Sequence, residues 1–221
     1  MPIRQYPAVF KFRGGHAALD FCNTVHWRRR PVYRELLIDY GHLVDWARAA
    51  AVVSTPEGRQ LEQLAAEHPR LSDARLQAAR ATRDALHGLL AARAAGQTPP
   101  EHDRAAVSQA LAEAAAHAEL VAGDGHYSLV VPAVTLDTIL WRVMLSANAL
   151  LIGPLINRVG QCQDPRGCGW LFLDTTRNHS RRWCAMDDCG SLDKARNYYR
   201  RAKAIAGKEE AAEPGPQAIE P

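Results

Sequence analysis

Four cysteines near the C-terminal end of the chain are the residues best suited to chemistry. They form two close pairs, Cys162/Cys168 and Cys184/Cys189, with five residues inside the first pair, fifteen between the pairs and four inside the second. Paired cysteines of this kind are typical of structural zinc sites, because Zn²⁺ prefers a tetrahedral shell of sulfur and nitrogen ligands. Four thiolates fill that shell and leave no position for a reacting water. The spacing predicts one structural Zn²⁺ on these cysteines.

The residues around the first pair predict how it is held. Asp164-Pro165 and Gly167 are turn formers that can bring both thiolates to face one metal. Residues 170–174 read as a strand of bulky side chains, and residues 181–183 could run back as its partner. We therefore expect a knuckle followed by a hairpin.

The second pair leads into a helix that is predicted from Ser191 onward. Ser191 is a candidate N-cap, and the positive end of a helix favours nearby thiolates. A knuckle, a hairpin and a helix that holds the last ligand make the order of a treble-clef finger. So small a module should depend on its metal, since structural zinc can contribute ~10–16 kcal/mol to folding.

Positive charge is concentrated in the same region. Residues 158–206 contain ten Lys or Arg and five Asp or Glu, and the rest of the chain is close to neutral or acidic. Cations on a compact zinc-bound unit can contact nucleic-acid phosphates. The alternative is an ordinary solvated helix face. The candidate nucleic-acid-binding residues are Arg181, Arg182, Lys194, Arg196, Arg200, Arg201 and Lys203.

Three segments, CGWLFLD, RRWCAMDDCG and KAR, resemble the CGNR zinc-finger family, bacterial proteins regarded as stress-induced transcription regulators. Members of that family carry an N-terminal ABATE domain, and its opening motif resembles residues 18–25 here, while residues 36–46 also fit it. The resemblance implies Zn²⁺ on the four cysteines, a treble-clef-like finger and DNA binding. Two positions depart from the signature: Cys189-Gly190 is followed by Ser191-Leu192 in place of Asn-Arg. A contact made by that arginine is lost here or has moved to Arg196.

The N-terminal part, residues 1–157, is expected to be one mainly helical domain. Helical patterns cover 17–26, 36–52, a segment that starts with Thr55 as cap and Pro56, a segment capped by Ser72, 101–118 and 134–152; strand-like runs cover 8–12 and 126–131. The predicted fold class is α+β, mainly α, with a zinc finger over 158–206. The Glu-, Ala- and Pro-rich tail, 207–221, is predicted to be disordered.

Asp20 and Asn23 are polar residues within an apolar stretch of this domain. One interpretation is local capping and buried hydrogen bonding. The other is a ligand-binding pocket for a small-molecule effector, with Trp27 or Arg28 nearby. The fifth cysteine, Cys22, is expected to be a buried free thiol. The sequence contains no Gly-rich phosphate loop, no His-x-x-x-His pair and no nucleophile elbow, so we expect no enzyme activity.

Composition limits the compartment and the partners. The 221 residues are 47% hydrophobic, without an uninterrupted apolar run long enough to span a membrane and without a signal-peptide pattern at the start. Reduced thiols favour metal binding over disulfides, so we expect a cytoplasmic protein. Two hypotheses remain: a transcription regulator whose finger contacts DNA while the helical domain senses a ligand or mediates pairing, or a zinc-bound protein-interaction module. The oligomeric state is left open.

Overall fold

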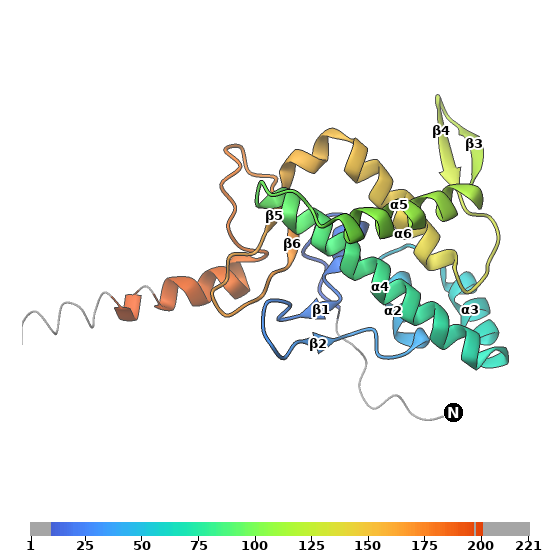
Figure 1. Ribbon diagram of the computed structural model, residues 1–221, viewed down its shortest axis with the longest axis horizontal. Coiled ribbons are helices and arrows are strands. Elements are labelled where there is room, and N and C mark those ends of the chain that lie inside the picture. Colours follow the sequence, from blue (N-terminus) through green and yellow to red (C-terminus); the bar gives the residue numbers. More distant parts are fainter. Residues whose placement is uncertain (1–9, 197, 201–221) are drawn as a thin grey trace, which may run out of the picture. The chain divides into compact units, whose positions relative to one another are not determined.

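A computed structural model of the chain describes residues 10–196 and 198–200 (Figure 1). The chain divides into two compact units, residues 1–184 and 185–221. The predicted class, α+β and mainly α, is confirmed. The helices of the first unit are α1 (Ala17–Cys22), α2 (Tyr40–Ala49), α3 (Thr55–Glu67), α4 (Pro69–Ala94), α5 (Glu101–Ala116), α6 (Thr138–Ile152) and the short 3₁₀ helix η1 (Pro154–Arg158).

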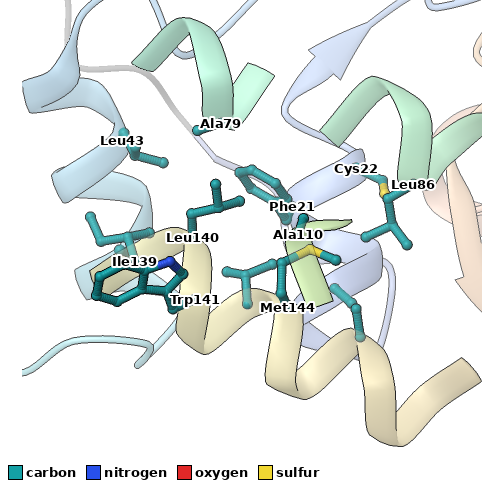
Figure 2. Packing of buried hydrophobic residues seen from close by; sticks show 14 of the residues in the cluster. Phe21, Cys22, Leu43, Ala79, Leu86, Ala110, Ile139, Leu140, Trp141 and Met144 are labelled. Atoms are coloured by element: carbon teal, nitrogen blue, oxygen red, sulfur yellow. The ribbon is translucent and has the colours of Figure 1, made fainter. Parts of the chain in front are cut away.

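One hydrophobic core fills the first unit. Side chains from α1, α2, α4, α5 and α6 converge in it, among them Phe21, Leu86 and Met144, each fully buried (Figure 2). The rings of Phe21 and Trp46 lie 5.1 Å apart between centroids and join α1 to α2. Helix α6 is apolar around most of its circumference, as its central place requires.

Two helix caps predicted in the first unit are wrong, and the helices expected at 36–52 and 134–152 begin four residues later, at Tyr40 and Thr138. Ser54, not Thr55, caps α3: its side chain accepts from the N–H of Glu57, whose carboxylate accepts from the N–H of Ser54. The predicted cap at Ser72 is wrong, because α4 already begins at Pro69 and the Ser72 hydroxyl donates to the Pro69 carbonyl. Proline at the first helical position explains the earlier start.

The strands of the first unit form two-stranded antiparallel sheets. β1 (Val25–His26) pairs with β2 (Arg34–Glu35), and β3 (Glu119–Gly123) pairs with β4 (His126–Val130). The predicted strand at 126–131 is confirmed as β4, and the β3–β4 hairpin projects from the helices (Figure 1). In the run predicted at 8–12, residues 10–12 are not a strand, and residues 8 and 9 lie outside the described part.

The third pair of strands, β5 (Val159–Gln161) and β6 (Leu171–Leu173), encloses the first cysteine pair. Val159 lies opposite Leu173, and Gln161 opposite Leu171. Val159, Leu171 and Leu173 belong to the same core as the helices. The predicted boundary after residue 157 falls at the end of η1, yet packing continues through β5 and β6 to Cys184. The tail predicted as disordered, 207–221, lies outside the described residues.

The return strand expected at 181–183 is wrong, because β6 pairs with β5 instead. The N–H of Arg181 donates to the carboxylate of Asp174 at 2.9 Å, and Gln163 donates its N–H to the carbonyl of Arg182 at 2.9 Å. Residues 181–183 are thus held by one side chain and one isolated main-chain hydrogen bond, so they do not form a ladder of strand hydrogen bonds. No helix of the described part is long and apolar enough to cross a membrane.

The second unit begins with the π-turn η2 (Met186–Gly190) and continues as helix over 191–196 and 198–200. The expected cap at Ser191 is wrong: Ser191 has helical dihedral angles, and its hydroxyl donates to the Asp188 carbonyl at 3.0 Å. The helical turn has already started five residues earlier, so Ser191 lies inside it.

Candidate metal centre

The four predicted zinc ligands come together. The sulfur atoms of Cys162, Cys168, Cys184 and Cys189 all lie within 4.8 Å of one another, and all four residues are buried. Cys168 and Cys184 are 3.7 Å apart at sulfur. A tetrahedral Zn²⁺ with Zn–S bonds of about 2.3 Å separates its ligands by about 3.8 Å. The donor set and its spacing fit one structural Zn²⁺.

The fifth cysteine is outside this group. Cys22 is fully buried in the helical core, and burial raises the pKa of its thiol to about 12. It stays a protonated thiol at neutral pH, as the sequence indicates. The zinc site and the free thiol are thus chemically distinct.

The turn between the first two ligands is held by Asp164. Its carboxylate accepts from the N–H of Arg166 at 2.9 Å and pairs with the Arg166 guanidinium, while its carbonyl accepts from the N–H of Gly167 at 2.9 Å. Gly167 has φ +93°, a conformation that favours glycine. The turn formers predicted from sequence therefore act as expected.

Asn23 ties helix α1 to strand β6. Its Nδ2 donates to the carbonyl of Leu171 at 2.8 Å, and its Oδ1 accepts from the N–H of Leu171 at 2.9 Å. Beside it, the indole N–H of Trp170 donates to the carbonyl of Val25 at 2.8 Å. The two bonds of Asn23 satisfy the buried N–H and carbonyl of Leu171.

The loop after β1 lies against the knuckle itself. Arg28 and Arg29 donate their N–H groups to the carbonyls of Cys168 and Gly167 at 3.2 and 3.0 Å. A Cβ added at Gly169, which has φ +69°, would lie 2.8 Å from Cγ of Arg29. Glycine at this position therefore permits both the turn and the close approach of the loop.

His87 of α4 is hydrogen-bonded to Gly169, the residue that follows the first cysteine pair. Its Nε2 lies 2.9 Å from the carbonyl of Gly169. Burial, followed by the nearby charge of Arg28, lowers the pKa of His87 to about 3. The imidazole is therefore neutral at pH 7 and must donate from Nε2, because a carbonyl can only accept. Neither His87 nor Trp170 was assigned a role from sequence.

Arg181 is half-buried, whereas Arg182, Lys194, Arg196 and Arg200 are exposed. The guanidinium of Arg181 lies 4.4 Å from the ring of Phe172 and donates to the carbonyls of Leu173 and Trp183 at 3.0 and 2.9 Å. These contacts give Arg181 a structural role. Arg182, in contrast, is exposed and lies over the ring of Trp183.

In the second unit, Lys194, Arg196 and Arg200 are exposed on the helical segment. Tyr198 and Tyr199 are also exposed there, at 70% and 72%. The remaining predicted cations, Arg201 and Lys203, lie outside the described residues. The helix therefore presents aromatic as well as basic groups.

The other candidate ligand-binding residue, Asp20, also has an internal partner. Its carboxylate accepts from the N–H of Gly14 at 2.7 Å, and burial raises its pKa to about 6. With Asn23 bonded to Leu171, neither side chain lines the cavity beside β5 or the groove beside β4. Both contacts agree with the interpretation of buried hydrogen bonding.

The fold and the site define a zinc-finger protein whose first knuckle is built into a helical domain. The chain belongs to the ABATE family: the model described as "Putative stress-induced transcription regulator" matches residues 15–154. A second model, described as a CGNR zinc finger, matches residues 158–202. The resemblance noted in the sequence is thereby confirmed at both ends. No curated protein matches the chain.

Proposed function

We propose that this protein is a zinc-dependent transcription regulator whose C-terminal helix contacts DNA phosphates. The observation that carries the proposal is the exposure of Lys194, Arg196 and Arg200 on the helical segment that follows the zinc ligand Cys189. Family membership supports a regulatory role. Four thiolates around Zn²⁺ leave no open coordination position, so we assign no catalytic activity.

The distribution of acidic groups supports a basic outer surface over residues 164–182. Asp164 and Asp174 are 2% and 6% exposed, whereas Arg177 and Arg182 are exposed. Carboxylates turned inward neutralise less of the field felt by an approaching phosphate. Arg182 therefore joins the helix cations as a proposed phosphate contact, and Arg181 does not.

The test is binding of a labelled random-sequence duplex to the zinc-loaded protein over a salt series. Each phosphate contact contributes about −0.9 to the slope of log K against log salt concentration. Replacing both Lys194 and Arg196 by alanine should make the slope shallower by about 2 units. Arg34→Ala, an exposed arginine on β2, is the matched control and should leave the slope unchanged. No duplex binding by the wild-type protein at low salt contradicts the proposal.

The exposed tyrosines favour a second candidate, a protein-interaction surface without nucleic-acid binding. Tyr198 and Tyr199 form an edge-to-face pair with 5.8 Å between centroids, and Leu192 and Met186 are 41% and 51% exposed. Exposed aromatic and methionine side chains are enriched at protein interfaces.

The same duplex assay separates the two candidates. A Tyr198→Ser/Tyr199→Ser variant that binds duplex like the wild type while Lys194→Ala/Arg196→Ala loses binding supports phosphate contact by the basic residues. Wild-type protein that ignores duplex but self-associates or binds a regulator through the tyrosines supports the second candidate. Sedimentation measures the association.

A further inference from the structure

A polar cavity of about 320 Å³ lies beside strand β5, next to the first zinc knuckle. Its volume is at the lower end of the range for small-molecule sites, which is about 300–1,000 Å³. The cavity belongs entirely to the first unit. The charged and polar residues that line it are Arg29, Asn157, Arg158, Gln161, Gln163, Asp174, His179 and Arg181.

Among the residues that line the cavity, arginines outnumber acidic residues. Arg29, Arg158 and Arg181 contribute three guanidinium groups, against the single carboxylate of Asp174. That carboxylate is already used: it accepts from the N–H groups of Thr176 and Arg181 at 2.8 and 2.9 Å. Burial alone would raise the pKa of Asp174, but the hydrogen bond from the Thr176 hydroxyl, together with those from the N–H groups of Arg181 and Thr176, outweighs burial and holds the pKa below its usual value.

The two deeper arginines are held in place by carbonyl groups, which fix them without neutralising their charge. Arg158 donates from Nη1 to the carbonyls of Asp174 and Thr176 at 3.3 and 3.2 Å. Arg181 donates to Leu173 and Trp183, as described above. Guanidinium groups that are positioned in advance bind an anion with a smaller entropy cost.

The third arginine, Arg29, is exposed and is placed by the knuckle. Its main chain is bonded to Gly167, and its side chain passes close to Gly169. Arg29 lies in the loop after β1, next to Trp27 and Arg28, and was given no role from sequence. In the structure this loop brings a cation from near the start of the chain to a cavity built by β5.

Two features of the cavity oppose an anion. The zinc ligand Cys162 also lines it, and four thiolates on one Zn²⁺ leave a net charge of about −2. Ala94 and Ala95, at the C-terminal end of α4, also line it, and helix C-termini carry partial negative charge. The N–H groups of Ala95, Gly96 and Gln97 cap carbonyls of the last turn, which reduces this charge. Arg93 in the same turn reduces it further. The charges around the cavity are therefore close to balanced, and a phosphate group is recognised through the N–H donors of the guanidinium groups rather than through net charge.

We propose that this cavity binds the phosphate group of a small phosphomonoester, with Arg29 and Arg158 as its principal contacts. Arginine guanidinium groups match phosphate geometry through paired N–H donors. Cys162 lines the cavity as well, so a bound ligand lies beside a zinc ligand and beside the loop that packs against the knuckle. This site, rather than Asp20 and Asn23, is where we place the effector of the regulator.

Phosphate binding in the cavity does not depend on DNA binding, and the experiment measures the two kinds of binding separately. Zinc-loaded full-length protein is titrated calorimetrically with inorganic phosphate and with dAMP, at an ionic strength kept constant with sodium chloride. Both probes should bind, and NMR shifts should change at the N–H groups of Gly160, Gln161 and Gln163. Arg29→Ala should weaken binding about tenfold, as expected for one lost charge-assisted contact.

Arg34→Ala is the control, because Arg34 is also exposed and does not line the cavity. Arg158→Gln should weaken binding as well, and the exposed position of Arg29 keeps the test valid if Arg158→Gln fails to fold. Equal affinities for Arg29→Ala and Arg34→Ala overturn the proposal. So does the absence of binding to either probe. If only duplex DNA binds, and Arg29→Ala weakens it, the phosphate is that of a DNA backbone and the small-molecule site is refuted.

Discussion

The side-chain amide of Asn23 is hydrogen-bonded to the main chain of Leu171, 148 residues away, through both its oxygen and its nitrogen. The amide thus bonds to the N–H and the carbonyl of Leu171 as a neighbouring strand would. Because β6 is followed closely by the residues that lead to Cys184, this contact joins the helical domain to the zinc site.

We expect Asn23→Ala to lower the free energy of unfolding by about 2–4 kcal/mol, because it leaves two buried backbone groups without partners. Urea unfolding of the zinc-loaded protein measures the change. Asn178→Ala, at an exposed position, is the matched control and should change stability by less than about 0.5 kcal/mol. A small effect at Asn23 would mean that water replaces the amide.

The neutral state of His87 predicts a pH dependence of stability. Its folded pKa of about 3 lies below its ordinary value of 6.5, so the unfolded chain takes up a proton that the folded chain does not. Stability from this group is therefore present above about pH 6.5 and is lost as the pH falls toward 3, by up to about 1.4 kcal/mol per pH unit.

The measurement is the difference in unfolding free energy between wild type and His87→Gln from pH 7.5 to 5.5, a window that limits acid loss of zinc. The disadvantage of the variant should shrink as the pH falls. Asp20, whose pKa is raised to about 6, titrates in both proteins and cancels in the difference. A constant difference across this range contradicts a depressed pKa.

Gly169→Ala tests the close approach of the Arg29 loop to the knuckle. The added Cβ meets a left-handed φ and a contact of 2.8 Å with Arg29. We expect destabilisation of about 2–4 kcal/mol, from about 1–2 kcal/mol of backbone strain and the remainder from overpacking.

Gly96→Ala provides the comparison, because Gly96 has nearly the same φ, +68°, with nothing within 4 Å of the added Cβ. It should show the backbone strain alone. Adding Arg29→Ala to Gly169→Ala should recover part of the loss. Equal effects of the two glycine substitutions would remove the steric explanation.

Removal of the metal should destabilise the protein without unfolding the helical core. Strands β5 and β6 are packed in the helical core, so chelation of zinc should leave most of the helical circular dichroism while it lowers the melting temperature. Cys168→Ser should abolish binding of one equivalent of zinc, whereas Cys22→Ala should retain it, since Cys22 lies outside the cluster. Co²⁺ substitution, read by its tetrahedral thiolate spectrum, follows both. Complete unfolding on chelation would show that the core of β5 and β6 needs the metal.

Much of the fold could be predicted because its signals are local. The helix at 101–118 and the strand at 126–131 were found at nearly their observed bounds, since propensity and alternation act over a few residues. The return strand at 181–183 was wrong because strand pairing depends on which partner competes. Here β5 competes better, since Val159 also gains burial in the core.

By itself the sequence determined the zinc ligands, because tetrahedral thiolate coordination demands four cysteines and the turn formers between Cys162 and Cys168 act within one knuckle. It also determined the family. Only the tertiary structure decided that Asn23 pairs with Leu171, that His87 supports Gly169, and that Arg29 lines a cavity with Arg158. These contacts join segments far apart in the chain, and a hydrogen bond or a cavity depends on distances that residue type and local spacing do not specify.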